Sequence, residues 1–144
     1  MSFNALVAEP DDAAWRAIAG GIRRQFPDAT LLRVKDGEQA LEFLLHRGPL
    51  TDDPEAPDLV LLAAELPFIP MERVFVRIRQ DSRTRTTPVI IRWYDLGATR
   101  VDLPGLFLAE GGLLVVCGPV GLEPQVSEAV RQLCGQPAYH EGVA

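Results

Sequence analysis

The chain has 144 residues, of which 47% are hydrophobic and 24% are charged. This length suits one compact domain around a single core and excludes a second full domain. Fourteen basic and 20 acidic residues give a formal net charge of −6, and we expect no cluster of Lys and Arg to offset it. Because such a surface repels phosphate backbones, nucleic acid is not an expected partner.

The longest apolar runs, at 59–64 and 113–117, fall far short of the roughly 20 residues that a membrane helix needs. The first residues lack the basic start and apolar stretch of a secretory signal. We therefore expect a cytoplasmic protein that makes no contact with membranes.

The two cysteines, Cys117 and Cys134, are expected to be thiols in that compartment. Their spacing matches no zinc site, and His46 and His140 lie far from both in the sequence. We expect no bound metal and no cofactor.

Strands and helices alternate along the chain. Short apolar or β-rich runs predict strands, and apolar residues at steps of three and four predict helices. The predicted strands are 5–8, 29–34, 58–62, 88–91 and 113–117, and the predicted helices are 11–26, 38–45, 71–78 and 123–133. Residues 47–57, rich in proline and acidic side chains, predict an exposed loop.

The fourth and fifth strands are joined by a segment with weak helical signals. Residues 94–112 contain four glycines and Pro104, so a helix there must be short or broken, at about 104–110. The alternation as a whole predicts an α/β fold, a single doubly wound five-stranded parallel sheet with helices on both faces. We expect residues 1–134 to form this domain, 135–144 to form a C-terminal tail, and function to lie at the carboxyl ends of the strands.

Three segments carry a family resemblance. Lys35 to Leu44, Pro57 to Leu62 with Leu66-Pro67, and Thr87 to Ile91 resemble the receiver domain of two-component response regulators, which has flavodoxin-like topology. The resemblance covers about residues 3–133 in the same order of elements. It is greatest to the small single-domain regulators that accompany bacterial phytochrome kinases.

The resemblance implies a phosphorylation site, but this sequence departs from it. The positions of the family's acidic pair, phosphorylated aspartate, hydroxyl residue, lysine and following proline are occupied by Glu9 and Pro10, Ala63, Trp93, Gly118 and Pro119, respectively. No carboxylate remains to be phosphorylated, and neither a hydroxyl nor a lysine remains to hold a phosphate. We therefore expect a degenerate pocket with no phosphoacceptor, no catalytic residue and no metal ion.

Two features of this pocket have alternative interpretations. Trp93 either fills the space vacated by the family's polar side chains, which we favour, or stacks on a ligand. Asp11 and Asp12 either cap the first helix, which we favour, or join Glu9 in holding a cation.

The favoured function is that of an atypical single-domain response regulator, a pseudo-receiver that is not phosphorylated and acts as a protein interaction module. Its expected partner is a sensor histidine kinase or another regulator. A homodimer through the fourth helix, the fifth strand and the fifth helix is also possible. The alternative is a small-ligand sensor that uses the altered pocket. An enzyme is not expected, because the sequence has no Gly-rich phosphate loop and no Ser/His/Asp grouping.

Overall fold

The structure is a computed structural model that describes residues 3–46, 56–93, 112–118 and 120–135. Its elements, in chain order, are β1 (Asn4–Ala8), α1 (Asp12–Gln25), β2 (Thr30–Val34), α2 (Gly37–His46), β3 (Leu59–Ala63), α3 (Met71–Gln80), β4 (Val89–Trp93), β5 (Leu113–Cys117) and α6 (Leu122–Cys134). Within these ranges, no helix is long and apolar enough to cross a membrane.

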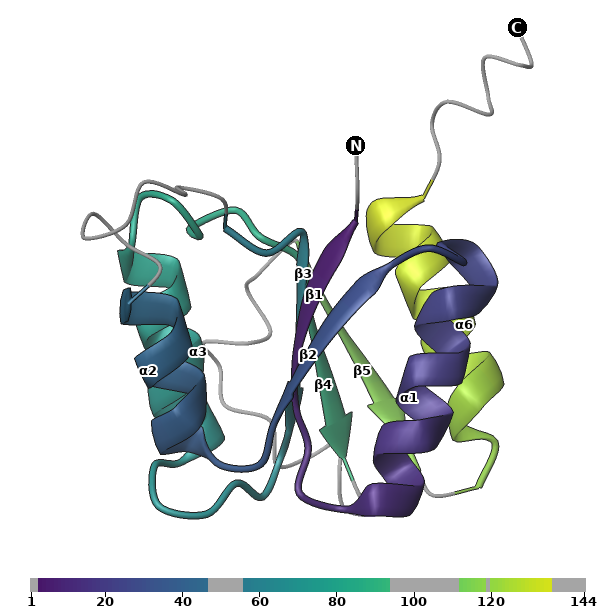
Figure 1. Ribbon diagram of the computed structural model, residues 1–144, viewed down its shortest axis with the longest axis horizontal. Helices are drawn as coiled ribbons and strands as arrows, with labels where there is room; N and C mark the ends of the chain where they lie inside the picture. The colour runs from purple at the N-terminus through teal and green to yellow at the C-terminus, as the bar shows by residue number, and fades with distance from the viewer. Residues whose placement is uncertain (1–2, 47–55, 94–111, 119, 136–144) are drawn as a thin grey trace, which may run out of the picture.

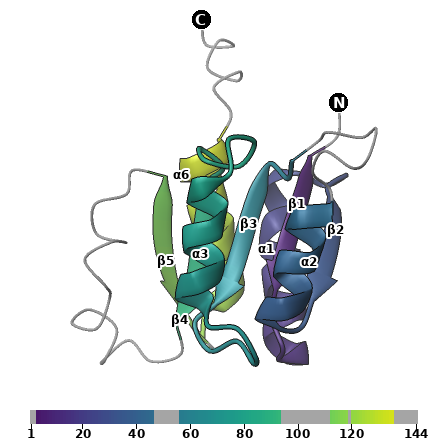
Figure 2. The same cartoon turned by 90° about the vertical axis from the view of Figure 1, so that its left-hand side faces the viewer.

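The five strands form one parallel sheet in the order β2-β1-β3-β4-β5. Helices α1 and α6 cover one face, and α2 and α3 cover the other (Figure 1). Figure 2 looks onto the face that carries α2 and α3. This arrangement confirms the predicted doubly wound α/β fold, and every described element lies within about two residues of its predicted place.

Several predictions fall on parts of the chain outside the described residues. These are the fourth helix within 94–111, most of the loop at 47–57, Pro119, His140 and the tail beyond residue 135, together with the side chains of His46 and Cys117.

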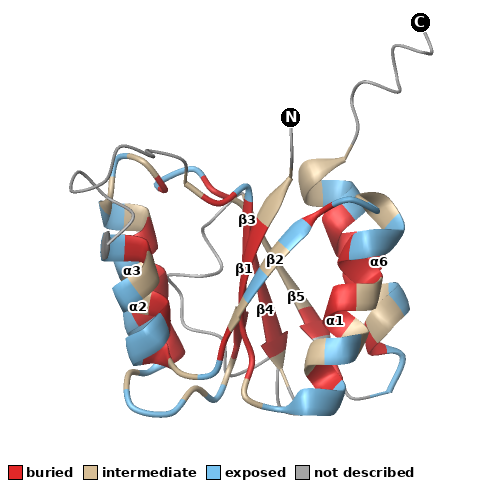
Figure 3. Ribbon diagram, in the orientation of Figure 1, coloured by how far each residue is buried: buried red, intermediate tan, exposed pale blue. Residues whose placement is uncertain are grey.

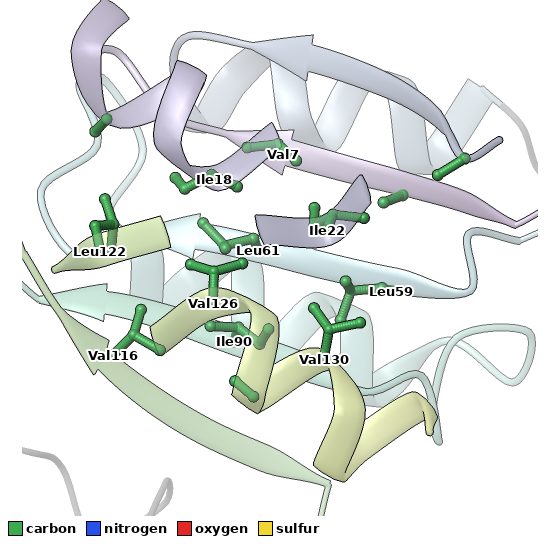
Figure 4. Close-up of a cluster of buried hydrophobic side chains, with 14 residues drawn as sticks. Val7, Ile18, Ile22, Leu59, Leu61, Ile90, Val116, Leu122, Val126 and Val130 are labelled. Atoms are coloured by element: carbon green, nitrogen blue, oxygen red, sulfur yellow. The ribbon is translucent and has the colours of Figure 1, made fainter. Parts of the chain in front are cut away.

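Two apolar clusters hold the helices against the sheet. Val7, Leu61 and Ile90 point toward α1 and α6, where Ile18 and Val126 meet them (Figure 4).

The second cluster lies beneath α2 and α3 and is built on Leu6, Leu62, Val74, Phe75 and Ile91. All five residues of β3 are buried, as its continuous apolar sequence predicts for a strand covered on both faces. Figure 3 shows the same division, with the buried sides of the helices turned toward the sheet.

The start of α2 is fixed against the loop that precedes α3. The Gly37 backbone N–H donates to the Pro67 carbonyl at 3.1 Å, and a Cβ at position 37 would lie 2.1 Å from the Ile69 carbonyl oxygen. Only glycine allows the two backbones to approach this closely. This contact holds the first turns of α2 and α3 side by side.

Candidate functional site

A buried ion pair lies at the carboxyl ends of β1 and β4. Glu9, directly after β1, is 0% exposed, and Arg92, in β4, is 2% exposed. Arg92 Nε donates to Glu9 Oε1 at 2.5 Å, and Arg92 Nη2 donates to Glu9 Oε2 at 2.8 Å. Two parallel bonds of this kind are the preferred geometry for a guanidinium with a carboxylate. Glu9 and Arg92 are the two charged side chains buried in the described part of the chain, and each neutralises the other.

Strand alternation places this pair beside the position of the family's phosphorylated aspartate. Ala63 is the register partner of Arg92 and is fully buried. Neighbouring Leu61 and Ile90 both point toward α1 and α6, so residues 63 and 92, each two positions further along, lie on that same face. The arginine thus lies where a carboxylate at position 63 would need space.

The site contains a positive charge that the sequence interpretation did not include. The position of the family's lysine, Gly118, is buried, and a Cβ built there would lie 3.2 Å from two methyl carbons of Leu122. Leu122 therefore takes much of the room that a longer side chain at 118 would need. The positive charge comes instead from Arg92 on the neighbouring strand.

The two other acidic side chains that follow β1, Asp11 and Asp12, also have hydrogen-bond or ion-pair partners. Asp11 caps α1 by accepting a hydrogen bond from the Ala14 N–H at 2.8 Å, and its own N–H donates to Glu9 Oε2 at 3.0 Å. This confirms the predicted cap. Asp12, in contrast, lies in the first turn of the helix and pairs with Arg33 at 2.8 Å.

Arg33 holds the loop in place from β2. Its Nε donates to the Glu9 carbonyl at 3.0 Å and its Nη2 to the Pro10 carbonyl at 3.2 Å. The guanidinium lies 5.6 Å from the ring centroid of Trp15, a cation–π distance. The hydrogen bond and charge of Arg33 lower the pKa of the Asp12 carboxyl below its usual value.

Among the described residues, no group of three His, Cys, Asp or Glu side chains could hold a metal ion.

Trp93 does not cover the buried pair. It is half-buried and packs against the cluster beneath α2 and α3, on the face of the sheet opposite Arg92. The side chain that fills the space beside Glu9 is Arg92, which corrects the expectation that Trp93 does so. Three of the best-formed pockets in the described structure lie elsewhere, and none of these three is lined by Glu9, Ala63 or Trp93.

Sequence reasoning missed Arg92, although the sequence contained a signal for it. Arg92 is the single charged residue in the run Val89-Ile90-Ile91-Arg92-Trp93, and this run is typical of a strand buried on both faces. A buried charge requires a partner. Glu9 is the acidic residue at the corresponding end of β1, on the same face.

Comparison with known proteins supports the fold. The phosphorylated cyanobacterial phytochrome response regulator RcpA matches with a TM-score of 0.73 and 18% identity over 93% of this chain and 95% of that one. The bacteriophytochrome response regulator RtBRR gives 0.76 and 23% over 92% and 78%. The chemotaxis response regulator CheY4 of Vibrio cholerae gives 0.72 and 12% over 92% and 99%. No family model and no curated protein sequence matches the chain. The chain thus has the fold of response regulator receiver domains, as its sequence predicted.

Proposed function

We propose that this protein is a cytoplasmic pseudo-receiver that works in two-component signalling as a protein interaction module independent of phosphorylation. The observation that carries the proposal is the buried Glu9–Arg92 pair beside Ala63. The likeness to phytochrome response regulators supports a protein partner of the signalling type, such as a sensor kinase or another regulator.

Phosphoryl transfer to a protein carboxylate needs a nucleophilic oxygen, a divalent cation and donors that neutralise the phosphoryl oxygens. Residue 63 has no carboxylate. Glu9, the buried acid of the site, already accepts two hydrogen bonds from Arg92 and one from the Asp11 N–H. A cation bound by Glu9 would leave Arg92 buried without its partner, and a phosphoryl group held by Arg92 would do the same to Glu9.

The same pair argues against the ligand-sensor alternative. A small-molecule site needs a concave, partly apolar space of at least a few hundred Å³. In the described part of the chain, Glu9 is paired with Arg92, and Ala63 and Gly118 are buried. Trp93 is half-buried and packs against the cluster beneath α2 and α3. We therefore place the function on the outer surface of the domain.

The test is a binding measurement with and without a phosphodonor. The immobilised protein captures partners from a native lysate of its source, beads carrying an unrelated acidic protein serve as the control, and mass spectrometry identifies what is retained. The purified partner is then titrated by calorimetry in the presence and absence of acetyl phosphate and Mg²⁺. We expect one Kd in both conditions. Binding that requires the phosphodonor, or no partner above the control, would overturn the proposal.

A further inference from the structure

The face that carries α2 and α3 has a groove of about 290 Å³. It runs between the two helices, and Figure 2 shows both of them on this face. The lining residues combine three apolar side chains with three charged ones, namely Leu41, Ile69, Glu72, Arg73, Val76 and Arg77. Amphipathic helices commonly bind in grooves of this kind, which are apolar and have charged residues at the rim.

The charge of this region is opposite to that of the whole chain. Residues 71–85 contain five arginines against two acidic residues, Glu72 and Asp81, which gives a local charge of +3 in a chain of −6. The expectation that no basic cluster offsets the negative charge is therefore wrong. Residues 71–85, which include α3, attract an acidic partner, whereas α2 on the other side of the groove carries the acidic residues Glu38 and Glu42.

Only some of these arginines stabilise the fold. Arg79 donates to the Thr87 carbonyl at 2.8 Å, and Arg83 donates to the Leu44 carbonyl and pairs with Asp81. Arg73 and Arg77 are exposed, and neither forms an ion pair with any residue in the described ranges.

Arg73 and Arg77 lie one helical turn apart on the wall of the groove. Like charges at this spacing destabilise an isolated helix. Carboxylates from outside would relieve that repulsion, so the spacing suits a partner with two acidic side chains one turn apart.

Two exposed apolar side chains lie close in the chain to residues that line the groove. Phe68, next to Ile69, is 79% exposed, and Leu45, one turn beyond Leu41 on α2, is 45% exposed. These are two of the four large hydrophobic residues exposed in the described structure. Phe68 also has a φ of +68°, a conformation that is unfavourable for an aromatic residue. An apolar stripe on a partner would cover both side chains.

We propose that the α2–α3 groove binds an acidic amphipathic helix of a protein partner. The carboxylates of that helix pair with Arg73 and Arg77, and its apolar side chains lie over Leu41, Ile69 and Val76. This inference rests on the proposed function and names the surface and the chemistry of the partner.

The test begins with an unbiased selection. A phage-displayed library of random peptides of about 15 residues, near the length at which isolated helices become marginally stable, is selected on the full chain. One enriched peptide is then titrated by fluorescence anisotropy against three proteins. These are the natural chain, the charge-reversed variant Arg73→Glu/Arg77→Glu, and the matched control Arg16→Glu/Arg23→Glu, which makes the same change in net charge at two exposed positions of α1.

We expect the enriched peptides to carry Asp or Glu at helical spacing beside Leu, Ile or Phe. Binding should weaken about tenfold in Arg73→Glu/Arg77→Glu, as expected for two exposed charge pairs turned from attraction to repulsion, and change much less in the control. Circular dichroism establishes that both variants are folded. Selected peptides that are basic or neutral, or an equal loss in both variants, would overturn the inference.

A second variant, Val76→Glu, separates this inference from the proposed function. It places a carboxylate on the apolar wall of the groove without changing either arginine. The cellular partner should bind this variant less well than the natural chain. If it binds both equally, the groove is not its docking surface, although the interaction module stands. If no partner binds either protein, the proposed function itself fails.

Discussion

Replacing Arg92 with Met tests whether the ion pair is buried and dry. The substitution keeps an unbranched side chain in β4 but removes both hydrogen bonds to the Glu9 carboxylate. Of the donors found for that carboxylate, the Asp11 N–H would remain. Breaking a buried pair from one side typically costs about 3–5 kcal/mol, because the other charge stays buried and uncompensated. Such a loss is a large share of the roughly 5–15 kcal/mol that stabilises an ordinary domain.

Urea unfolding at pH 7, followed by tryptophan fluorescence and circular dichroism, measures this loss. With a slope near 2 kcal/mol per M, the midpoint of Arg92→Met should fall by about 2 M. The double variant Glu9→Met/Arg92→Met removes both charges and should recover most of the stability.

Arg131→Met, which breaks the exposed pair with Glu128, is the matched control and should cost at most about 1 kcal/mol. If Arg92→Met costs no more than this control, the Glu9–Arg92 pair is solvated and the reasoning is refuted.

Three further predictions concern single residues. Ala63→Asp should lower the free energy of unfolding by roughly 1–3 kcal/mol, because a second carboxylate would share one buried guanidinium with Glu9; a variant as stable as the natural chain in urea would contradict this. Asp11→Ala should cost about 1 kcal/mol by thermal unfolding, through loss of the α1 cap, whereas no change would mean that the cap is not needed. Burial raises the pKa of the Cys134 thiol to about 11. Folding therefore favours the neutral thiol, and this contribution to stability is complete below about pH 9 and lost as the pH rises toward about 11. At pH 8, alkylation of Cys134, followed by peptide mass spectrometry, should be roughly 100-fold slower in the native chain than in urea; equal rates would show that the thiol is exposed.

The fold could be predicted because each layer leaves a local pattern in the sequence. The continuous apolar run of β3 indicates a strand covered on both faces, and Trp15, Ile18 and Ile22 mark the inner side of α1. Asp11 could be identified as a cap because capping acts over three residues. Local patterns of this kind fix the elements and their buried faces.

The content of the site could not be predicted in the same way. Glu9 and Arg92 are 83 residues apart, and they meet only because β1 and β4 both lie next to β3. Assigning Trp93 to the site required knowing which of two adjacent residues faces α1 and α6, and alternation places Arg92 there instead. Likewise, periodicity predicts that Arg73 and Arg77 are exposed, but it does not reveal whether a side chain from another element pairs with them.

The central claim, that this site does not accept a phosphoryl group, is tested most directly by intact mass. The natural chain is incubated with acetyl phosphate and Mg²⁺, alongside a receiver domain that retains its aspartate as the positive control, and both are measured without acid treatment. We predict an unchanged mass for this chain, because Ala63 has no nucleophilic oxygen and Arg92 holds Glu9. A stable gain of about 80 Da, one phosphoryl group, on any of its carboxylates would contradict the account.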